Sequence, residues 1–168
     1  SASAIEKMAY LGRSHRAKKP LQQIKTLIQL TGEILELPKG YKVAIVPGSD
    51  TGAFELLMWS LLGKNETTMF AWESFGNDWA EDAVNQLKLA ECKVDRAGYG
   101  DLPKLTGVSR NSDICFTWNG TTSGVRVPNA NWIEKNEDRL VLCDATSAVF
   151  SQELDWEKLD GVSFSWQK

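Results

Sequence analysis

Apolar residues recur along this chain with two alternating periods, one typical of helices and one typical of strands. Helical spacing of leucine and isoleucine over residues 21–35 predicts a helix, with Pro20 in its first turn and Pro38-Lys39-Gly40 after its end. Further helices are predicted over Phe54–Leu62 and Asn77–Leu89. Short apolar runs predict strands at Lys42–Val46, Thr68–Trp72, Lys93–Ala97, Ile114–Trp118, Leu140–Cys143 and Gly161–Phe164.

This alternation of helices and strands predicts an α/β fold. Because the strand runs are apolar throughout, both faces of each strand should be covered, which favours a mostly parallel sheet flanked by helices. The 168 residues have the length of one domain. Ligands of such sheets bind beyond the carboxyl ends of the strands, so the residues that follow each strand form the candidate site.

The segments after the strands carry polar chemistry, at Gly48–Gly52, Glu73–Phe75, Asn119–Ser123, Asp144 and Lys168. The Gly48–Gly52 loop leads into a helix, and free amide N–H groups at a helix N-terminus suit a phosphate. The same loop is also explained as a turn in which Asp50 or Thr51 caps the helix. It lacks the Gly-Lys-Ser/Thr ending of a Walker loop.

Each of the other segments has two interpretations as well. Phe75 either stacks on a flat ring or packs in the core, and Asn119–Gly124 is either a source of ligand hydroxyls or an ordinary polar turn. Asp144 directly follows an apolar run, so its carboxylate should be partly buried and need a hydrogen-bond donor or a cation such as a pyridinium. In the alternative interpretation, Asp144 caps the next segment. Lys168 is a solvated surface charge unless a pocket desolvates it, and a neutral amine can then attack an aldehyde.

Together these segments predict pyridoxal phosphate (PLP) as a cofactor. PLP needs a phosphate cradle, a face to stack on, a hydrogen bond to its ring oxygen, an acid opposite its nitrogen and a lysine. Each need has a candidate residue, and all the candidates lie at one edge of the predicted sheet.

Composition gives no support to several other classes of function. The net charge is −3 and no basic stripe is present, so nothing supports nucleic-acid binding. No apolar run approaches the roughly 18 residues that cross a membrane. One histidine and three separated cysteines do not predict a metal site. Thiols within apolar runs behave as small hydrophobic groups, which favours a reduced, cytoplasmic setting.

The motifs also resemble those of phosphoserine aminotransferases, in the same order and at compatible spacing. They are Ser14-His15-Arg16, Gly48–Gly52, Trp72–Phe75, Phe116–Val125, Cys143–Ser147 and Ser165–Lys168. The resemblance implies that residues 1–168 are the N-terminal part of the large PLP-binding domain of a fold-type I aminotransferase. The family continues past the lysine through a small C-terminal domain that is absent from this chain, and its members are homodimers with shared active sites.

The resemblance also implies roles around the cofactor. Lys168 would hold PLP as a Schiff base, and Gln167 would contact the phosphate region. Asp144 would pair with the pyridine nitrogen, Thr121 would hydrogen-bond the ring-oxygen side, and Phe75 would stack on the ring.

Other roles concern phosphate and substrate. Asp50 and Thr51 would give backbone donors to the cofactor phosphate. Arg16 would hold the substrate α-carboxylate, with His15 nearby as a phosphate contact. Two positions depart from much of the family, which has arginine where this chain has Thr51 and tryptophan where it has Phe75.

The implied reaction transfers an amino group between L-glutamate and 3-phosphohydroxypyruvate, giving O-phospho-L-serine for serine biosynthesis. One alternative is another fold-type I enzyme, such as an alanine–glyoxylate aminotransferase or a cysteine desulfurase; no cysteine in an evident reactive loop supports the desulfurase. A second alternative is a non-catalytic phosphate- or nucleotide-binding module, in which Gly48–Gly52 is the site and Lys168 has no role.

Overall fold

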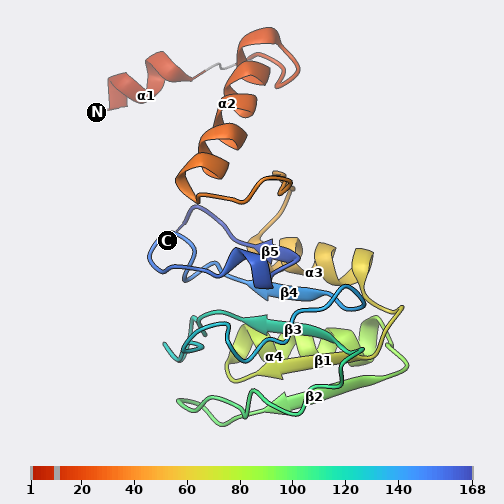
Figure 1. Cartoon of the computed structure of the whole chain (residues 1–168). Coiled ribbons are helices and arrows are strands. Elements are labelled where there is room, and N and C mark those ends of the chain that lie inside the picture. Colours follow the sequence, from red (N-terminus) through yellow and green to blue (C-terminus); the bar gives the residue numbers. More distant parts are fainter. Residues whose placement is uncertain (1, 10–11, 168) are drawn as a thin grey trace. The chain divides into compact units, whose positions relative to one another are not determined.

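The computed structural model describes residues 2–9 and 12–167, and the chain divides into two compact units, residues 1–45 and 46–168 (Figure 1). The first unit contains α1 (Ala2–Met8) and α2 (Lys18–Ile34). Helix α2 confirms the helix predicted over residues 21–35, with Pro20 in its first turn, where a missing N–H costs nothing. Helix α1 was not predicted, because its short run has no clear apolar face.

The strand predicted at Lys42–Val46 is wrong. The segment forms no strand, and Ile45 is 44% exposed. An apolar run becomes a strand only when a neighbouring strand pairs with its backbone. No strand in the described part of the chain pairs with this segment.

The second unit is built on a five-stranded sheet. Its strands are β1 (Thr67–Ala71), β2 (Cys92–Arg96), β3 (Asp113–Thr117), β4 (Val141–Asp144) and β5 (Gly161–Ser163). They lie in the order β2-β1-β3-β4-β5, and every neighbouring pair is parallel. The predicted α/β fold is therefore confirmed, with strand bounds within about one residue of those expected from the sequence.

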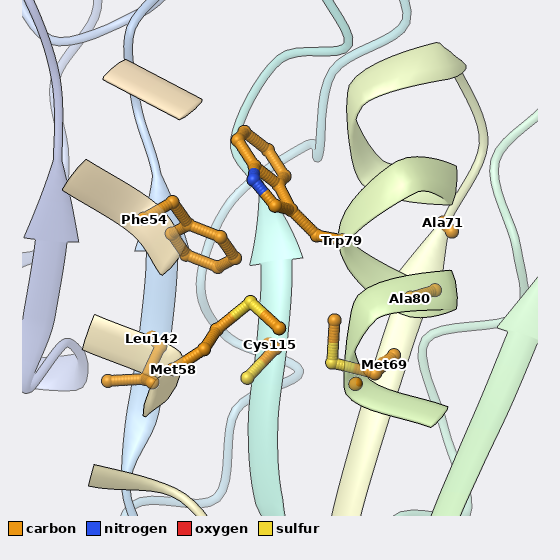
Figure 2. Packing of buried hydrophobic residues seen from close by; sticks show 9 residues of the cluster. Phe54, Met58, Met69, Ala71, Trp79, Ala80, Cys115 and Leu142 are labelled. Carbon is orange, nitrogen blue, oxygen red and sulfur yellow. The ribbon is translucent and has the colours of Figure 1, made fainter. Parts of the chain in front are cut away.

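Two helices, α3 (Asp50–Leu61) and α4 (Ser74–Glu81), cover one face of this sheet, and a π-helical turn (Asp82–Gln86) extends α4. Phe54 and Met58 of α3 meet Trp79 of α4 over the strands (Figure 2). The Phe54 and Trp79 rings lie 4.5 Å apart between centroids. This packing holds both helices against the sheet. Each helix begins at the edge of the sheet where the strands have their carboxyl ends.

The other face of the sheet is covered by an irregular connection rather than by a helix. Phe70 of β1 and Phe116 of β3 both make edge contacts with Trp132, at centroid distances of 5.4 and 5.1 Å. The connection between β3 and β4 therefore contributes an aromatic side chain to the core. This explains how strands that are apolar throughout are buried on both faces.

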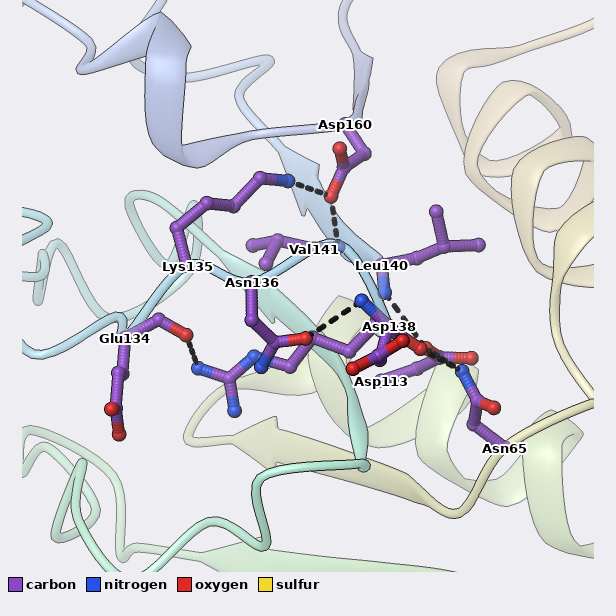
Figure 3. Close-up of polar contacts among 10 residues, drawn as sticks. Asn65, Asp113, Glu134, Lys135, Asn136, Asp138, Leu140, Val141 and Asp160 are labelled. Atoms are coloured by element: carbon purple, nitrogen blue, oxygen red, sulfur yellow. Dashed lines mark hydrogen bonds and ion pairs between the residues drawn. The ribbon is translucent and has the colours of Figure 1, made fainter.

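The amino ends of the strands are braced by two carboxylates, the buried Asp113 and the more exposed Asp160 (Figure 3). Asp113 at the start of β3 accepts hydrogen bonds from Leu140 N at 2.8 Å and from Asn65 Nδ2 at 3.0 Å. Asp160 accepts from Val141 N at 2.8 Å and forms an ion pair with Lys135. These bonds join three connections at the edge opposite the carboxyl ends, so this polar cluster serves the fold.

Among the described residues, no helix combines the length and the apolar character needed to cross a membrane.

Candidate functional site

The strand order contains a switch point between β1 and β3. The chain passes from β1 to β2 on one side, and then returns to place β3 on the other side of β1. In open parallel sheets the two connections that leave such a point diverge, and ligands bind in the crevice between them. The segments that follow β1 and β3 include Glu73–Phe75 and Asn119–Ser123, two of the segments that the sequence indicated as candidates.

Asp144 ends β4 at this same edge, and its side chain is 3% exposed. Its Oδ1 accepts three hydrogen bonds: from Thr146 Oγ1 at 3.0 Å, from Ser163 Oγ at 3.1 Å and from Thr146 N at 3.3 Å. Burial, followed by the adjacent Asp50 carboxyl, raises the pKa of Asp144 from 3.8 to about 8, while the bonds from Thr146 act to lower it. Asp144 is thus held rigidly but lacks a cation among the described side chains around it.

Asp50 lies at the first turn of α3 and faces Asp144. Ser49 is the N-cap, and its Oγ accepts a hydrogen bond from Gly52 N at 3.4 Å. The Asp50 carboxyl group is close enough to that of Asp144 to contribute to its raised pKa, and its Oδ1 is buried without a donor in the described part of the chain. The sequence indicated either a backbone role for Asp50 or a cap by Asp50 or Thr51; the cap is Ser49 instead. The side-chain contact of Asp50 with Asp144 depends on the packing of α3 against β4 and was missed.

The N-terminus of α3 also offers free donors. The amide N–H groups of Asp50 and Thr51 have no acceptor among the described residues, as is usual for the first turn of a helix. Gly48, just before the cap, has φ +101°, a conformation that favours glycine. These features leave the predicted phosphate cradle geometrically available, directly beside Asp144.

Phe75 lies in the first turn of α4 and is 38% exposed. Its ring packs on one side against Trp79, one turn further along the helix, at 6.2 Å between centroids and with 36° between the ring planes. Trp79 in turn contacts Phe54 of the core. Phe75 is therefore a supported ring with a free surface, which a core residue would not have.

Thr121 lies in the turn after β3. Its Oγ1 hydrogen-bonds with Ser147 Oγ, in the segment after β4, at 2.6 Å. The turn is closed by Gly120 N donating to Val125 O at 2.8 Å and by Gly124 N donating to Gly120 O at 2.7 Å. The bond between Thr121 and Ser147 connects the segments that leave β3 and β4, which brings the Thr121 turn and the Asp144 segment together.

The remaining predicted residues are not brought into this geometry. Lys168 lies outside the described residues. Gln167 is exposed in the turn after β5, with no described hydrogen-bond partner. His15 and Arg16 belong to the unit of residues 1–45, in an exposed turn where Arg16 N donates to Ser14 Oγ at 3.1 Å. Their roles stay predictions.

The structure adds residues that the sequence did not single out. Thr146 and Ser163 orient Asp144, and Glu73 is buried at the switch point. The Asp-Ala-Thr spacing of residues 144–146 is a local signal, because a threonine hydroxyl two residues after an aspartate can reach its carboxylate. Among the described side chains, no group of three or more histidine, cysteine, aspartate or glutamate residues could hold a metal ion.

The arrangement fits a flat ligand with an anionic arm and a cationic ring atom. Free amides of α3 suit the anion, and the exposed face of Phe75 suits the ring. The unpartnered Asp50 Oδ1 and the buried carboxyl of Asp144 call for a positively charged donor. A pyridinium N–H supplies such a donor, so these residues fit PLP.

Comparison with known proteins supports the family resemblance. No protein-family model matches the chain. The phosphoserine aminotransferase of Methanosarcina mazei is 50% identical over 160 residues, which cover 95% of this chain and 43% of that protein. The crystal structure of a phosphoserine aminotransferase from Cytophaga hutchinsonii superposes with a TM-score of 0.83 at 29% identity, covering 99% of this chain and 46% of that one.

A PLP-bound phosphoserine aminotransferase from Trichomonas vaginalis has a TM-score of 0.71 at 16% identity, over 94% of this chain and 45% of that one, which shows likeness of fold. The similarity inferred from the motifs is confirmed. The chain spans less than half the length of the relatives it matches.

Proposed function

We propose that this chain, which resembles phosphoserine aminotransferases along nearly its whole length, is the N-terminal part of a PLP-dependent enzyme that transfers an amino group between L-glutamate and 3-phosphohydroxypyruvate. The relatives' name supports the substrates, and the 50% identity to one of them supports applying that name here. An aminotransferase of another specificity, such as one acting on alanine and glyoxylate, has less support because the names of the curated relatives point to phosphoserine.

The observation that carries the proposal is the buried Asp144 beside the free amides of α3. This carboxyl group at the end of β4 is fixed by three hydrogen bonds, and burial raises its pKa, so a cation beside it would stabilise its ionised form. A pyridine nitrogen placed there would be kept protonated, and bound PLP would then act as an electron sink for bond cleavage at the substrate Cα.

The other residues of the chain would bind, orient and move protons. The amides of Asp50 and Thr51 would hold the phosphate, and Phe75 would cover one face of the ring. Lys168, at the end of the segment after β5, would attach the cofactor and then move the proton at the substrate Cα. Arg16 and His15 would contact the carboxylate and phosphate of the substrate.

The same resemblance supports a homodimer with shared active sites, a cytoplasmic location and a role in serine biosynthesis. Residues 1–168 would be the first part of the large cofactor domain, and the small domain would lie outside this chain. Sedimentation equilibrium of the complete protein measures the dimer directly, and a monomer at micromolar concentration would contradict it.

Absorbance of the complete protein tests the cofactor. The protein mixed with PLP should show a band at about 400 nm that borohydride removes, leaving the cofactor fixed to Lys168 in peptide mass spectra. Fixation on another lysine, or no band, would overturn the proposal.

Asp144→Ala should abolish activity while retaining the fold by circular dichroism. Equal loss of activity and fold would assign Asp144 a structural role.

Substrate choice needs a separate measurement. The kcat/KM for 3-phosphohydroxypyruvate with glutamate should exceed that for glyoxylate with alanine by orders of magnitude, because discrimination between substrates is the ratio of these values. A preference for glyoxylate would keep the cofactor assignment and replace the substrate assignment.

A further inference from the structure

Glu73 is a buried carboxylate immediately after β1 at the switch point, and its side chain is 2% exposed. It is the N-cap of α4, where its Oε1 accepts a hydrogen bond from Gly76 N at 2.6 Å. Helix caps are normally serine, threonine, aspartate or asparagine, whose short side chains reach the first turn. Capping alone therefore does not explain the choice of glutamate.

The second oxygen of Glu73 reaches the turn on the other side of the crevice. Its Oε2 accepts a hydrogen bond from Thr122 Oγ1 at 3.2 Å. Thr122 Oγ1 in turn accepts from Ser74 N and Ser74 Oγ, each at 3.4 Å. One hydroxyl thus connects the turn after β3 to two consecutive residues of the segment after β1.

The packing around this contact leaves little room for movement. A Cβ added at Gly120 would lie 2.6 Å from Glu73 Cγ and 2.8 Å from Trp72 Nε1. Trp72 Nε1 also donates to Val125 O at 3.0 Å, and Tyr99 Oη donates to Thr122 O. The glycine lets the backbone of the turn lie directly against the stem of Glu73, so this carboxylate is a fixed part of the crevice wall.

The hydrogen bond between Glu73 and Thr122 forms a bridge between α4 and the turn after β3. Two candidate cofactor contacts lie close to this bridge in the sequence. Phe75 follows Glu73 by two residues, and Thr121 precedes Thr122. A change in the length of the bridge therefore changes the separation between the exposed ring of Phe75 and the hydroxyl of Thr121, which hydrogen-bonds Ser147 on the far side.

We propose that Glu73 is a positioning residue of the cofactor site: by bridging α4 to the Thr121–Thr122 turn, it sets the width of the crevice between the ring-stacking face and the ring-oxygen donor. The inference rests on the proposed function and deepens it. Glu73 itself touches no reacting atom, and it acts through Phe75 and Thr121.

Glu73→Asp in the complete protein separates the bridge from the cap, because aspartate can cap α4 but is one methylene too short to reach Thr122 as well. Titration of cofactor-free protein with PLP, followed by tryptophan fluorescence, should show about tenfold weaker binding, as when the crevice has the width that binds the cofactor only about a tenth of the time. The induced circular dichroism of the bound cofactor should change, while the thermal unfolding midpoint of the cofactor-free protein changes little.

Thr122→Val removes the other end of the bridge and should give the same loss, and Thr122→Ser should restore binding. The double variant Glu73→Asp with Thr122→Val should lose no more than either single variant, since both break one contact. Glu81→Asp in the same helix is the matched control, because exposed Glu81 pairs with Arg96 away from the turn, and it should bind PLP as the wild type does.

The outcomes separate this inference from the proposed function. Wild-type protein that fails to bind PLP overturns both. Wild-type binding together with unchanged affinity and dichroism in Glu73→Asp overturns the positioning role alone. Weaker binding that only parallels a lower unfolding midpoint also overturns it, because Glu73 would then serve the fold and not the site.

Discussion

The carboxyl group of Asp50, at the start of α3, lies beside the carboxyl group of Asp144, at the end of β4. Burial and this neighbouring carboxyl group raise the pKa of Asp144 to about 8, because a negative charge there would be desolvated and close to a second acidic group. Asp144 therefore holds a proton near neutral pH in the protein without its cofactor. A cationic donor entering the crevice would take the place of that proton.

The first prediction concerns the pH dependence of stability in the cofactor-free protein. The pKa of Asp144 in the folded protein is about 8, against an ordinary value of 3.8, so the folded state binds this proton more tightly than the unfolded state. The stabilisation that this bound proton gives to the folded state is complete below about pH 4 and is lost as the pH rises through about 8. Urea unfolding should show the free energy of unfolding falling by at most about 1.4 kcal/mol per pH unit within this window.

Asp50→Asn tests the origin of this slope. The asparagine amide can donate to the Asp144 carboxylate and carries no charge, so the pKa of Asp144 should fall and the slope between pH 5 and pH 8 should flatten, by the ordinary effects of neighbouring charge and hydrogen bonding. A slope equal to that of the wild type would show that the Asp50 carboxyl does not control the titration.

A second prediction concerns Thr146, whose hydroxyl donates to Asp144 Oδ1 at 3.0 Å. Thr146→Val keeps the shape of the side chain but removes this donor, so the pKa of Asp144 should rise further and the loss of stability should extend to higher pH. Thr146→Ser keeps the hydroxyl and serves as the control. Identical pH profiles for the valine and serine variants would contradict the assigned hydrogen bond.

The sequence predicted the parts of the site that depend on position along a strand. Asp144 follows an apolar run, and in a parallel sheet the end of such a run faces the ligand edge, so its place was accessible from pattern alone. The loop before α3 was assigned to the same edge by a predicted strand, Lys42–Val46, that does not form. An apolar run does not reveal whether a partner strand exists, and the place of this loop depends instead on the packing of α3 against the sheet.

Contacts between separate connections were not predictable. Asp50 meets Asp144, and Glu73 meets Thr122, only because α3, α4 and the Thr121 turn pack at particular angles on the sheet. Glu73 stood within a recognised motif, yet its side-chain length was informative only once Gly76 and Thr122 were both within reach. Local sequence shows which polar groups lie near the edge, and packing decides how they pair.

A third prediction tests whether the polar cluster at the amino ends of the strands affects the cofactor site at their carboxyl ends. Asp113 is fully buried at the amino end of β3, and Asp113→Ala leaves Leu140 N without its acceptor and Asn65 Nδ2 with Asp138 O alone. The free energy of unfolding should fall by about 1–3 kcal/mol or somewhat more, while the folded fraction binds PLP with unchanged affinity. Asp113→Asn keeps an acceptor and should lose less. Weaker binding by the folded fraction would show that this edge communicates with the site.

The last prediction concerns Gly120, whose φ is not in the left-handed region, so that any effect of substitution comes from contact. In Gly120→Ala the new methyl group would lie 2.6 Å from Glu73 Cγ, in a place where backbone and buried side chains meet. Overpacking of this kind costs about 1–3 kcal/mol, and the turn that carries Thr121 should move to relieve it. Urea unfolding of the complete protein should therefore show lower stability, and PLP titration should show weaker binding.

Gly98→Ala is the matched control, because its new methyl group would be no closer than 3.8 Å to Asp101 Oδ2, and it should be neutral or slightly stabilising. If Gly120→Ala were as stable as Gly98→Ala and bound PLP equally well, the close approach of Glu73 to the turn would have no energetic consequence.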